Sequence, residues 1–113
     1  MSERDAALPV ALNHAQRWLA SLDDRPVPPQ AQVEELVDRL GTELPDGPRE
    51  AAAVIEHLAT ALEPGLTAMP SGRFYGMVIG GAHPAALAAD WLTSAWDQNA
   101  GCLLYTSPSP RDS

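Results

Sequence analysis

The stretch VALNHAQRWLASL, residues 10–22, carries the pattern on which the predicted fold depends. Its apolar residues recur at the i, i+3, i+4, i+7 spacing that places side chains on one face of an α-helix. Asn13, Gln16 and Arg17 fall on the opposite face. The stretch therefore predicts an amphipathic helix whose packing face consists of Ala11, Leu12, Ala15, Trp18, Leu19 and Leu22.

A stiff connector separates this helix from a second one. Residues 23–29, DDRPVPP, hold three prolines in four residues, which remove backbone donors and push their neighbours toward extended geometry. The spacing of Val33, Leu36, Val37 and Leu40 predicts a second short helix over residues 30–40. Gly41 follows at the position where a left-handed residue ends a helix.

Two further helices are predicted from the same kind of spacing. The third covers about residues 48–62, with Asp46 as its N-cap and Pro48 inside its first turn. The Pro64-Gly65 pair closes it. The fourth covers about residues 84–98.

The glycine-rich residues 65–83 predict a loop with a short extended piece at Met77–Ile79. The predicted fold of the chain is therefore mostly α, with four short helices and one glycine-rich loop. Large apolar residues are sparse, and a domain this small buries only about 60–70% of its unfolded surface. We expect the helices either to pack on one another or to form an arm that lies against something larger.

The composition disfavours several classes of partner. The formal net charge is −8, and all seven basic residues are arginine. Such a charge repels nucleic acid phosphates and anionic membranes. No apolar run approaches the roughly 20 residues of a membrane-spanning helix, the N-terminus has no secretory signal pattern, and no Cys/His cluster has metal-site spacing. We therefore expect a cytoplasmic protein with no metal, nucleic acid or membrane partner.

The last twelve residues, CLLYTSPSPRDS at positions 102–113, differ in composition from the rest of the chain. Residues 102–112 can be back-translated, codon by codon, into the transposase adapter used to build shotgun sequencing libraries. We therefore expect residues 102–113 to be adapter-derived and not native, with the natural reading frame continuing past Gly101. On this interpretation Cys102 is not a nucleophile.

Four motifs between residues 73 and 100 resemble a known family. They are RFYG (residues 73–76), GGAHP (80–84), AALAADWL (85–92) and WDQNA (96–100). Together with the preceding helices and the RPVPP segment, they are similar to the N-terminal part of the pyridoxal-phosphate-dependent group II decarboxylases, which include the aromatic-L-amino-acid, tyrosine and glutamate decarboxylases. Ser71-Gly72 stands where this family usually has His-Pro.

The resemblance implies an α/β parent enzyme of PLP fold type I, in the aspartate aminotransferase superfamily. It would be a homodimeric carboxy-lyase that converts an L-amino acid to an amine and carbon dioxide. Residues 1–64 would be a helical arm that clasps the partner subunit, and residues 65–101 the substrate-side loop and the start of the cofactor domain. Met77, Val78, Ile79 and Gly80 would hold the loop's substrate-binding positions, where their aliphatic character argues against an aromatic substrate.

The sequence lacks part of the chemistry that this family needs. Decarboxylation with pyridoxal 5'-phosphate requires a lysine that forms the internal aldimine and an aspartate beside the pyridine nitrogen. The sequence contains no lysine, so we expect the chain alone to be inactive, with no catalytic or cofactor-binding residue. The alternative, from another functional class, is a small helical protein-interaction module that binds a partner through its apolar faces.

The remaining polar and aromatic candidates have structural interpretations as well as functional ones. His14 and His57 are expected at solvated or rim positions. His83, before a proline, is expected to shape a helix start, with a role in the pocket as the alternative. We further expect an Asp90–Arg73 pair, helix-terminal or pocket roles for Asp97, Gln98 and Asn99, and packing roles for Trp18, Trp91 and Trp96.

Overall fold

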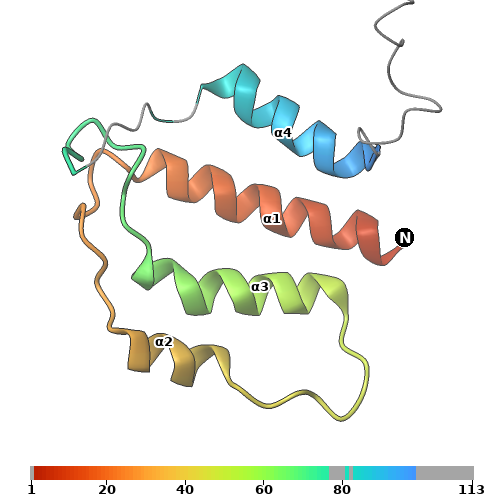
Figure 1. Cartoon of the computed structure of the whole chain (residues 1–113). Helices are drawn as coiled ribbons and strands as arrows, with labels where there is room; N and C mark the ends of the chain where they lie inside the picture. Colours follow the sequence, from red (N-terminus) through yellow and green to blue (C-terminus); the bar gives the residue numbers. More distant parts are fainter. Residues whose placement is uncertain (1, 77–80, 82, 99–113) are drawn as a thin grey trace, which may run out of the picture. The chain divides into compact units, whose positions relative to one another are not determined.

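The computed structural model describes residues 2–76, 81 and 83–98, and the regular elements in these ranges are all helical (Figure 1). They comprise four α-helices and one short 3₁₀ helix, with no β-strand in the described ranges, which confirms the mostly α prediction. The chain divides into two compact units, residues 1–81 and residues 82–113. The domain boundaries expected from the sequence stay predictions.

Helix α1 (Glu3–Ala20) begins well before the predicted start at Val10. Ser2 is its N-cap: the Ser2 hydroxyl accepts from the Asp5 N–H at 3.2 Å, and the Asp5 carboxylate accepts from the Ser2 N–H at 3.4 Å. This reciprocal pair satisfies two donors that would otherwise be unpaired at the helix start. The predicted start is wrong because Pro9 favours a helix boundary, whereas the capping pair sets the boundary earlier and leaves Pro9 inside the helix.

The proline-rich connector is tied to the chain that follows the third helix. The N–H groups of Gln30 and Ala31 both donate to the Pro64 carbonyl, at 2.7 and 3.1 Å. The Ala68 N–H donates to the Val27 carbonyl at 2.8 Å. These bonds hold the connector in place without a helix, so the predicted helix start at Gln30 is wrong.

Helix α2 (Val33–Leu40) is correspondingly shorter than predicted. Gln32 precedes it, and the Gln32 N–H donates to Glu35 Oε1 at 3.4 Å. Gly41 ends the helix, as predicted, but it is the C-cap and has a φ of 86° without the predicted left-handed helical conformation. Its ψ of 151° lies outside the left-handed helical region, in a conformation that is essentially restricted to glycine.

Helix α3 (Ala51–Leu62) continues directly into the 3₁₀ turn η1 (Glu63–Gly65). The predicted N-cap at Asp46 is wrong, because Glu50 is the capping residue. The Ala51 N–H donates to Glu3 Oε1 on α1 at 3.2 Å, so a side chain from a distant segment satisfies the first donor of α3. A long-range partner of this kind leaves no local sequence signal.

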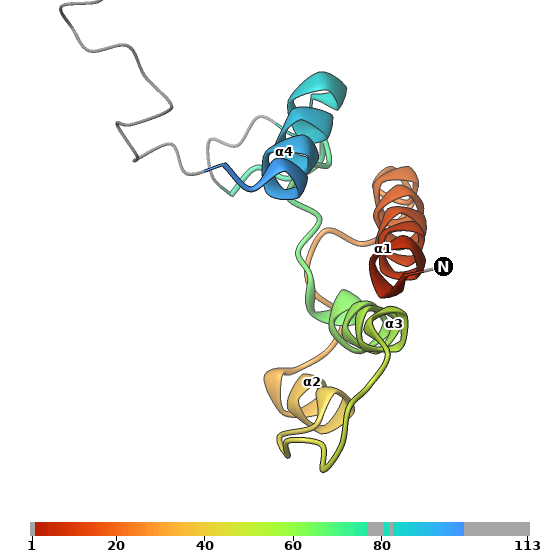
Figure 2. The same cartoon turned by 90° about the vertical axis from the view of Figure 1, so that its right-hand side faces the viewer.

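The three helices of the first unit form a row with α3 in the middle (Figures 1 and 2). Both α1 and α2 pack on α3, and α2 also packs on η1. The apolar face of α1 and one edge of α2 therefore meet the same central helix. This arrangement leaves α2 as an edge helix with one side free of the row.

Gly65 allows α2 and η1 to approach each other closely. A Cβ at Gly65 would overlap the Leu36 side chain, whereas a Cβ at Gly47 would meet nothing within 4 Å. We expect Gly65→Ala to lower the free energy of unfolding by about 1 kcal/mol, the low end for overpacking, because the half-buried Leu36 side chain must turn aside. Urea denaturation followed by far-ultraviolet circular dichroism measures this change.

Gly47→Ala is the matched control for this prediction. Neither glycine has a positive φ, so alanine is conformationally acceptable at both positions. In the control, the lower entropy of the unfolded chain should leave stability unchanged or raised by about 0.4–1 kcal/mol. Equal effects of the two substitutions would mean that Gly65 does not mediate a close contact.

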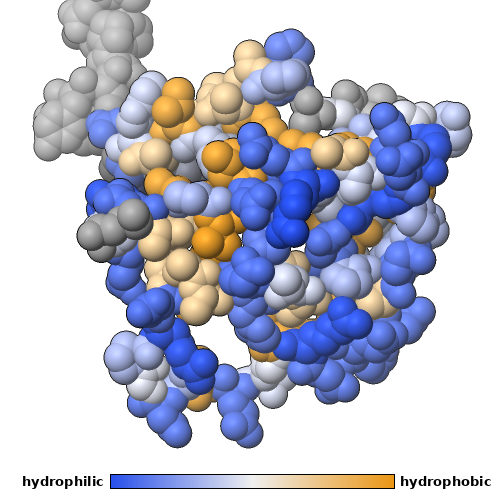
Figure 3. Space-filling view, turned by 180° about the vertical axis from the view of Figure 1, so that it is seen from behind, coloured by the Kyte–Doolittle hydropathy of each residue, from blue (hydrophilic) through white to orange (hydrophobic). Residues whose placement is uncertain are grey.

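The core of the described residues is very small. Ala61 and Ala68 are the buried apolar residues, at 4% and 0% exposure, and Ser71 is also buried, at 6%. Many larger apolar side chains stay open to solvent, and Figure 3 shows apolar residues exposed among polar ones on the face that it presents. In the first unit they are Leu8, Leu12, Val33, Val37, Leu40, Leu44, Val54, Leu58, Leu66, Met69 and Tyr75.

Helix α4 (Pro84–Trp96) is the described helix of the second unit and starts where predicted. His83 is its N-cap, and His83 Nδ1 accepts from the Ala85 N–H at 3.1 Å, which confirms the helix-start role. The helix ends at Asp97, a left-handed residue with φ 52° and ψ 46°. None of the helices in the described ranges is long and apolar enough to span a bilayer.

Candidate functional site

A groove of about 230 Å³ is formed by residues of α1, α3 and the turn that follows α3. Leu58 and Leu66 in its wall are 42% and 46% exposed, so the groove is open to solvent. It is smaller than the roughly 300–1,000 Å³ of most small-molecule sites. Its lining residues are His14, Ala15, Trp18, Leu58, Ala59, Leu62, Glu63 and Leu66.

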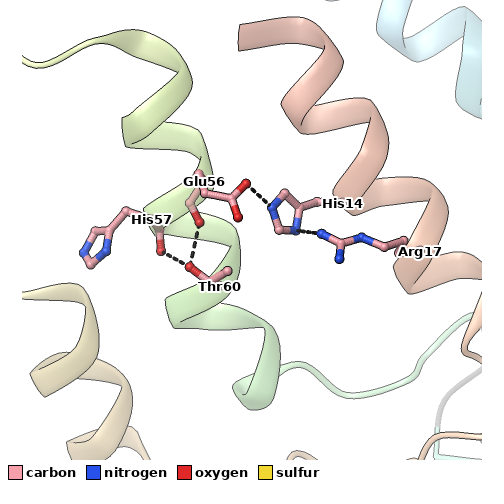
Figure 4. A network of polar contacts seen from close by, with 5 residues as sticks. All are labelled: His14, Arg17, Glu56, His57 and Thr60. Carbon is pink, nitrogen blue, oxygen red and sulfur yellow. Dashed lines mark hydrogen bonds and ion pairs between the residues drawn. The ribbon is translucent and has the colours of Figure 1, made fainter.

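A polar network joins α1 to α3 at His14 (Figure 4). His14 Nε2 lies 2.6 Å from Glu56 Oε2, and only 12% of the His14 side chain is exposed. The Arg17 guanidinium lies 3.2 Å from His14 Nδ1. Because a guanidinium can only donate, Nδ1 must accept and Nε2 must carry the proton that it donates to Glu56. The network therefore fits a neutral imidazole.

The Arg25 side chain contacts three other side chains near the C-terminal end of α1. Its guanidinium lies over the Trp18 ring, 5.6 Å from the centroid, and forms an ion pair with Glu63. Its Nε donates to Ser21 Oγ at 2.7 Å. The Trp18 Nε1 is buried and has no hydrogen-bond partner among the described residues. Arg25 therefore links α1, the proline-rich connector and η1 through one side chain.

Arg73 anchors the segment after the third helix to the end of α1. Its guanidinium donates to the Leu22 carbonyl at 2.7 Å and also to the Arg25 carbonyl. The Arg73 N–H donates to Ser71 Oγ at 3.1 Å. The pairing of Arg73 with Asp90 stays a prediction, since the two residues belong to different units.

The residues expected to contact substrate, Met77, Val78, Ile79 and Gly80, lie outside the described residues, as does Asn99. His57 is exposed, as expected, and its Nε2 lies 2.8 Å from the Leu40 carbonyl of α2. Asp97 has the expected helix-terminal place, and Gln98 Nε2 donates to the Trp96 carbonyl at 2.9 Å. The substrate-contact roles of Met77, Val78, Ile79 and Gly80 therefore stay predictions.

The groove has little capacity for catalysis. In the described part of the chain, no group of three or more His, Cys, Asp or Glu side chains is placed to hold a metal ion. His14 and Glu63, the ionisable residues of the groove, are already paired with Glu56 and Arg25. What remains is an apolar surface, which is suited to packing against another apolar group.

Two features of this region are not predicted from the sequence. The His14–Glu56 contact joins residues 42 positions apart, and the sequence pattern places Arg25 only within the proline-rich connector. The sequence does contain a signal for the partial burial of His14. His14 lies four residues before Trp18 and one before Ala15, at the edge of the apolar face of the first helix, where a partly buried side chain is expected.

Comparison of the chain with protein-family models, curated proteins and solved structures finds no match. The resemblance to the group II decarboxylases therefore rests on the sequence motifs alone.

Proposed function

We propose that residues 1–101 are the N-terminal arm and the start of the main domain of a pyridoxal-phosphate-dependent amino-acid decarboxylase. The RFYG, GGAHP, AALAADWL and WDQNA motifs carry this proposal. The very small core of the described residues supports it, because helices that leave so many large apolar side chains exposed require another surface to cover them. In this proposal the covering surface is the rest of the parent homodimer, of PLP fold type I.

The residues of this chain do not fit the cofactor by themselves. An internal aldimine requires a lysine side chain, and the sequence has none. The described residues that line the groove between α1 and α3 include no arginine to hold a phosphate group, and the nearby Arg25 is paired with Glu63. The chain is therefore proposed to supply packing surface, with Met77, Val78, Ile79 and Gly80 on the substrate side in the parent.

The downstream gene sequence tests this proposal directly. We expect independently amplified genomic DNA to continue the reading frame past the Gly101 codon with residues other than CLLYTSPSPRDS, and to encode a cofactor-binding lysine. Expressed from that gene, the parent should show the absorbance of bound pyridoxal phosphate and release carbon dioxide from an amino acid. The 113-residue chain should do neither. The same twelve codons and a stop in genomic DNA would refute the proposal.

The second candidate function is a helical protein-interaction module. The observation that favours it is the free edge of α2, where Val33 and Val37 are 69% and 44% exposed. A sharply cooperative thermal transition of the chain as a monomer would favour this module over the arm, because an arm depends on the rest of its enzyme.

A further inference from the structure

The apolar face of α2 is only partly covered by the first unit. Leu36 packs toward Gly65 in η1. The other residues of the same face, Val33, Val37 and Leu40, are 69%, 44% and 38% exposed. The exposed parts of Val33, Val37 and Leu40 form an apolar strip along two turns of helix, about 12 Å long at about 1.5 Å per residue.

The segment that contains this strip is acidic. Residues 32–50 carry six acidic residues and two arginines, a net charge of −4, which is half of the chain's net charge of −8. Glu34 and Asp38, four residues apart, lie on the helix face next to Val37. Among the described residues, Arg25–Glu63 is an ion pair and His14 donates a hydrogen bond to Glu56, so no acidic side chain of residues 32–50 is neutralised by an ion pair there.

We propose that this face of α2 is a docking surface for a basic amphipathic helix of another protein. The exposed strip fits the apolar face of a partner helix, and lysines or arginines beside that face would meet Glu34 and Asp38. A second copy of this chain fits poorly, because its α2 would bring the same carboxylates against these ones. Anionic membranes and nucleic acids are repelled for the same reason. The inference rests on the second candidate function, the interaction module, because in the proposed decarboxylase the rest of the parent would cover this face.

The test uses the whole chain and two synthetic probes with one apolar pattern. One is a fluorescent leucine/lysine amphipathic helix, and the other has glutamate in place of every lysine. Fluorescence anisotropy should show binding of the lysine probe at low salt, weaker binding at high salt, and no binding of the glutamate probe. Absence of binding by the lysine probe, or equal binding of both probes, would overturn the proposal.

Matched variants separate this face from attraction by net charge alone. E34Q/D38N and D23N/D24N remove the same charge, but only the first pair lies on α2. We expect E34Q/D38N to weaken binding of the lysine probe about fivefold and D23N/D24N less than about twofold, since exposed charge pairs contribute modestly. Equal losses in the two variants would show adhesion by overall charge and would refute a site on α2.

Two further variants, each lacking one exposed apolar side chain, test the apolar part of the proposed surface. Val37→Ser on α2 and Leu8→Ser on α1 each remove an exposed apolar side chain, 44% and 51% exposed, so both variants should keep the helical circular dichroism signal. We expect only Val37→Ser to weaken binding, by about threefold to tenfold, because part of the Val37 surface is buried on docking. An unchanged affinity of Val37→Ser would contradict the proposed surface.

Discussion

Replacing Trp18 by alanine should lower the free energy of unfolding by about 3 kcal/mol, whereas replacing it by phenylalanine should leave that energy nearly unchanged. Trp18 packs in the groove region between α1 and α3 and lies under the Arg25 guanidinium. Alanine removes both contacts and widens the open groove of a unit whose buried apolar residues are two alanines. A core this small has little other packing with which to compensate for the lost contacts.

The small effect expected for phenylalanine follows from the Trp18 Nε1. This N–H is buried without a partner among the described residues, and such a group costs about 1–3 kcal/mol in the folded state. Phenylalanine gives up part of the indole's packing surface but also removes this unpaired donor, so the two changes offset each other. Most of the stacking surface beneath Arg25 is retained.

Urea denaturation followed by far-ultraviolet circular dichroism measures both variants, with amide hydrogen exchange in α1 and α3 as a second readout. The two readouts do not depend on indole fluorescence, which both substitutions alter. A loss of more than about 2 kcal/mol in the phenylalanine variant would mean that Nε1 contributes a hydrogen bond. A loss below about 1 kcal/mol in the alanine variant would mean that α1 and α3 do not depend on Trp18 for their packing.

The sequence predicts the existence and type of the four helices because each has apolar residues that recur at helical spacing over several turns. The apolar spacing of α1 and α3 survives in the structure: Trp18 and Leu58 both line the groove between them. Helix boundaries are predicted less well, since they depend on single hydrogen bonds. Ser2 and Asp5 set the start of α1. The first N–H of α3, that of Ala51, donates to Glu3, which lies 48 residues earlier in the chain.

The candidate site is less predictable than the fold for the same physical reason. The helix-start role of His83 is predicted correctly because its bond to Ala85 spans two residues and depends only on the following proline and helix. The contacts of His14 with Glu56 and of Arg25 with Glu63 span 42 and 38 residues, and no local pattern encodes them. The roles of Met77, Val78, Ile79 and Gly80 are inferred from resemblance and stay predictions.

Arg25→Ala should be the next most damaging substitution, with an expected loss of about 2–3 kcal/mol. The side chain is 21% exposed and makes three contacts: the stack on Trp18, the hydrogen bond to Ser21 Oγ and the ion pair with Glu63. The stack and the hydrogen bond each contribute on the order of 1 kcal/mol, and the half-exposed ion pair contributes less than that. Arg39→Ala, on the exposed part of α2, is the control and should change stability by less than about 0.5 kcal/mol.

Glu63→Gln separates these contributions. The Glu63 side chain is 41% exposed, so solvent screens its charge, and we expect this substitution to cost no more than about 1 kcal/mol. The stack on Trp18 and the bond to Ser21 remain in that variant, because neither involves Glu63. A double-mutant cycle between Arg25→Ala and Glu63→Gln should therefore give a coupling energy well below the full loss in Arg25→Ala. If Glu63→Gln destabilised the chain as much as Arg25→Ala, the ion pair, and not the stacked arginine, would hold the end of α1 against η1.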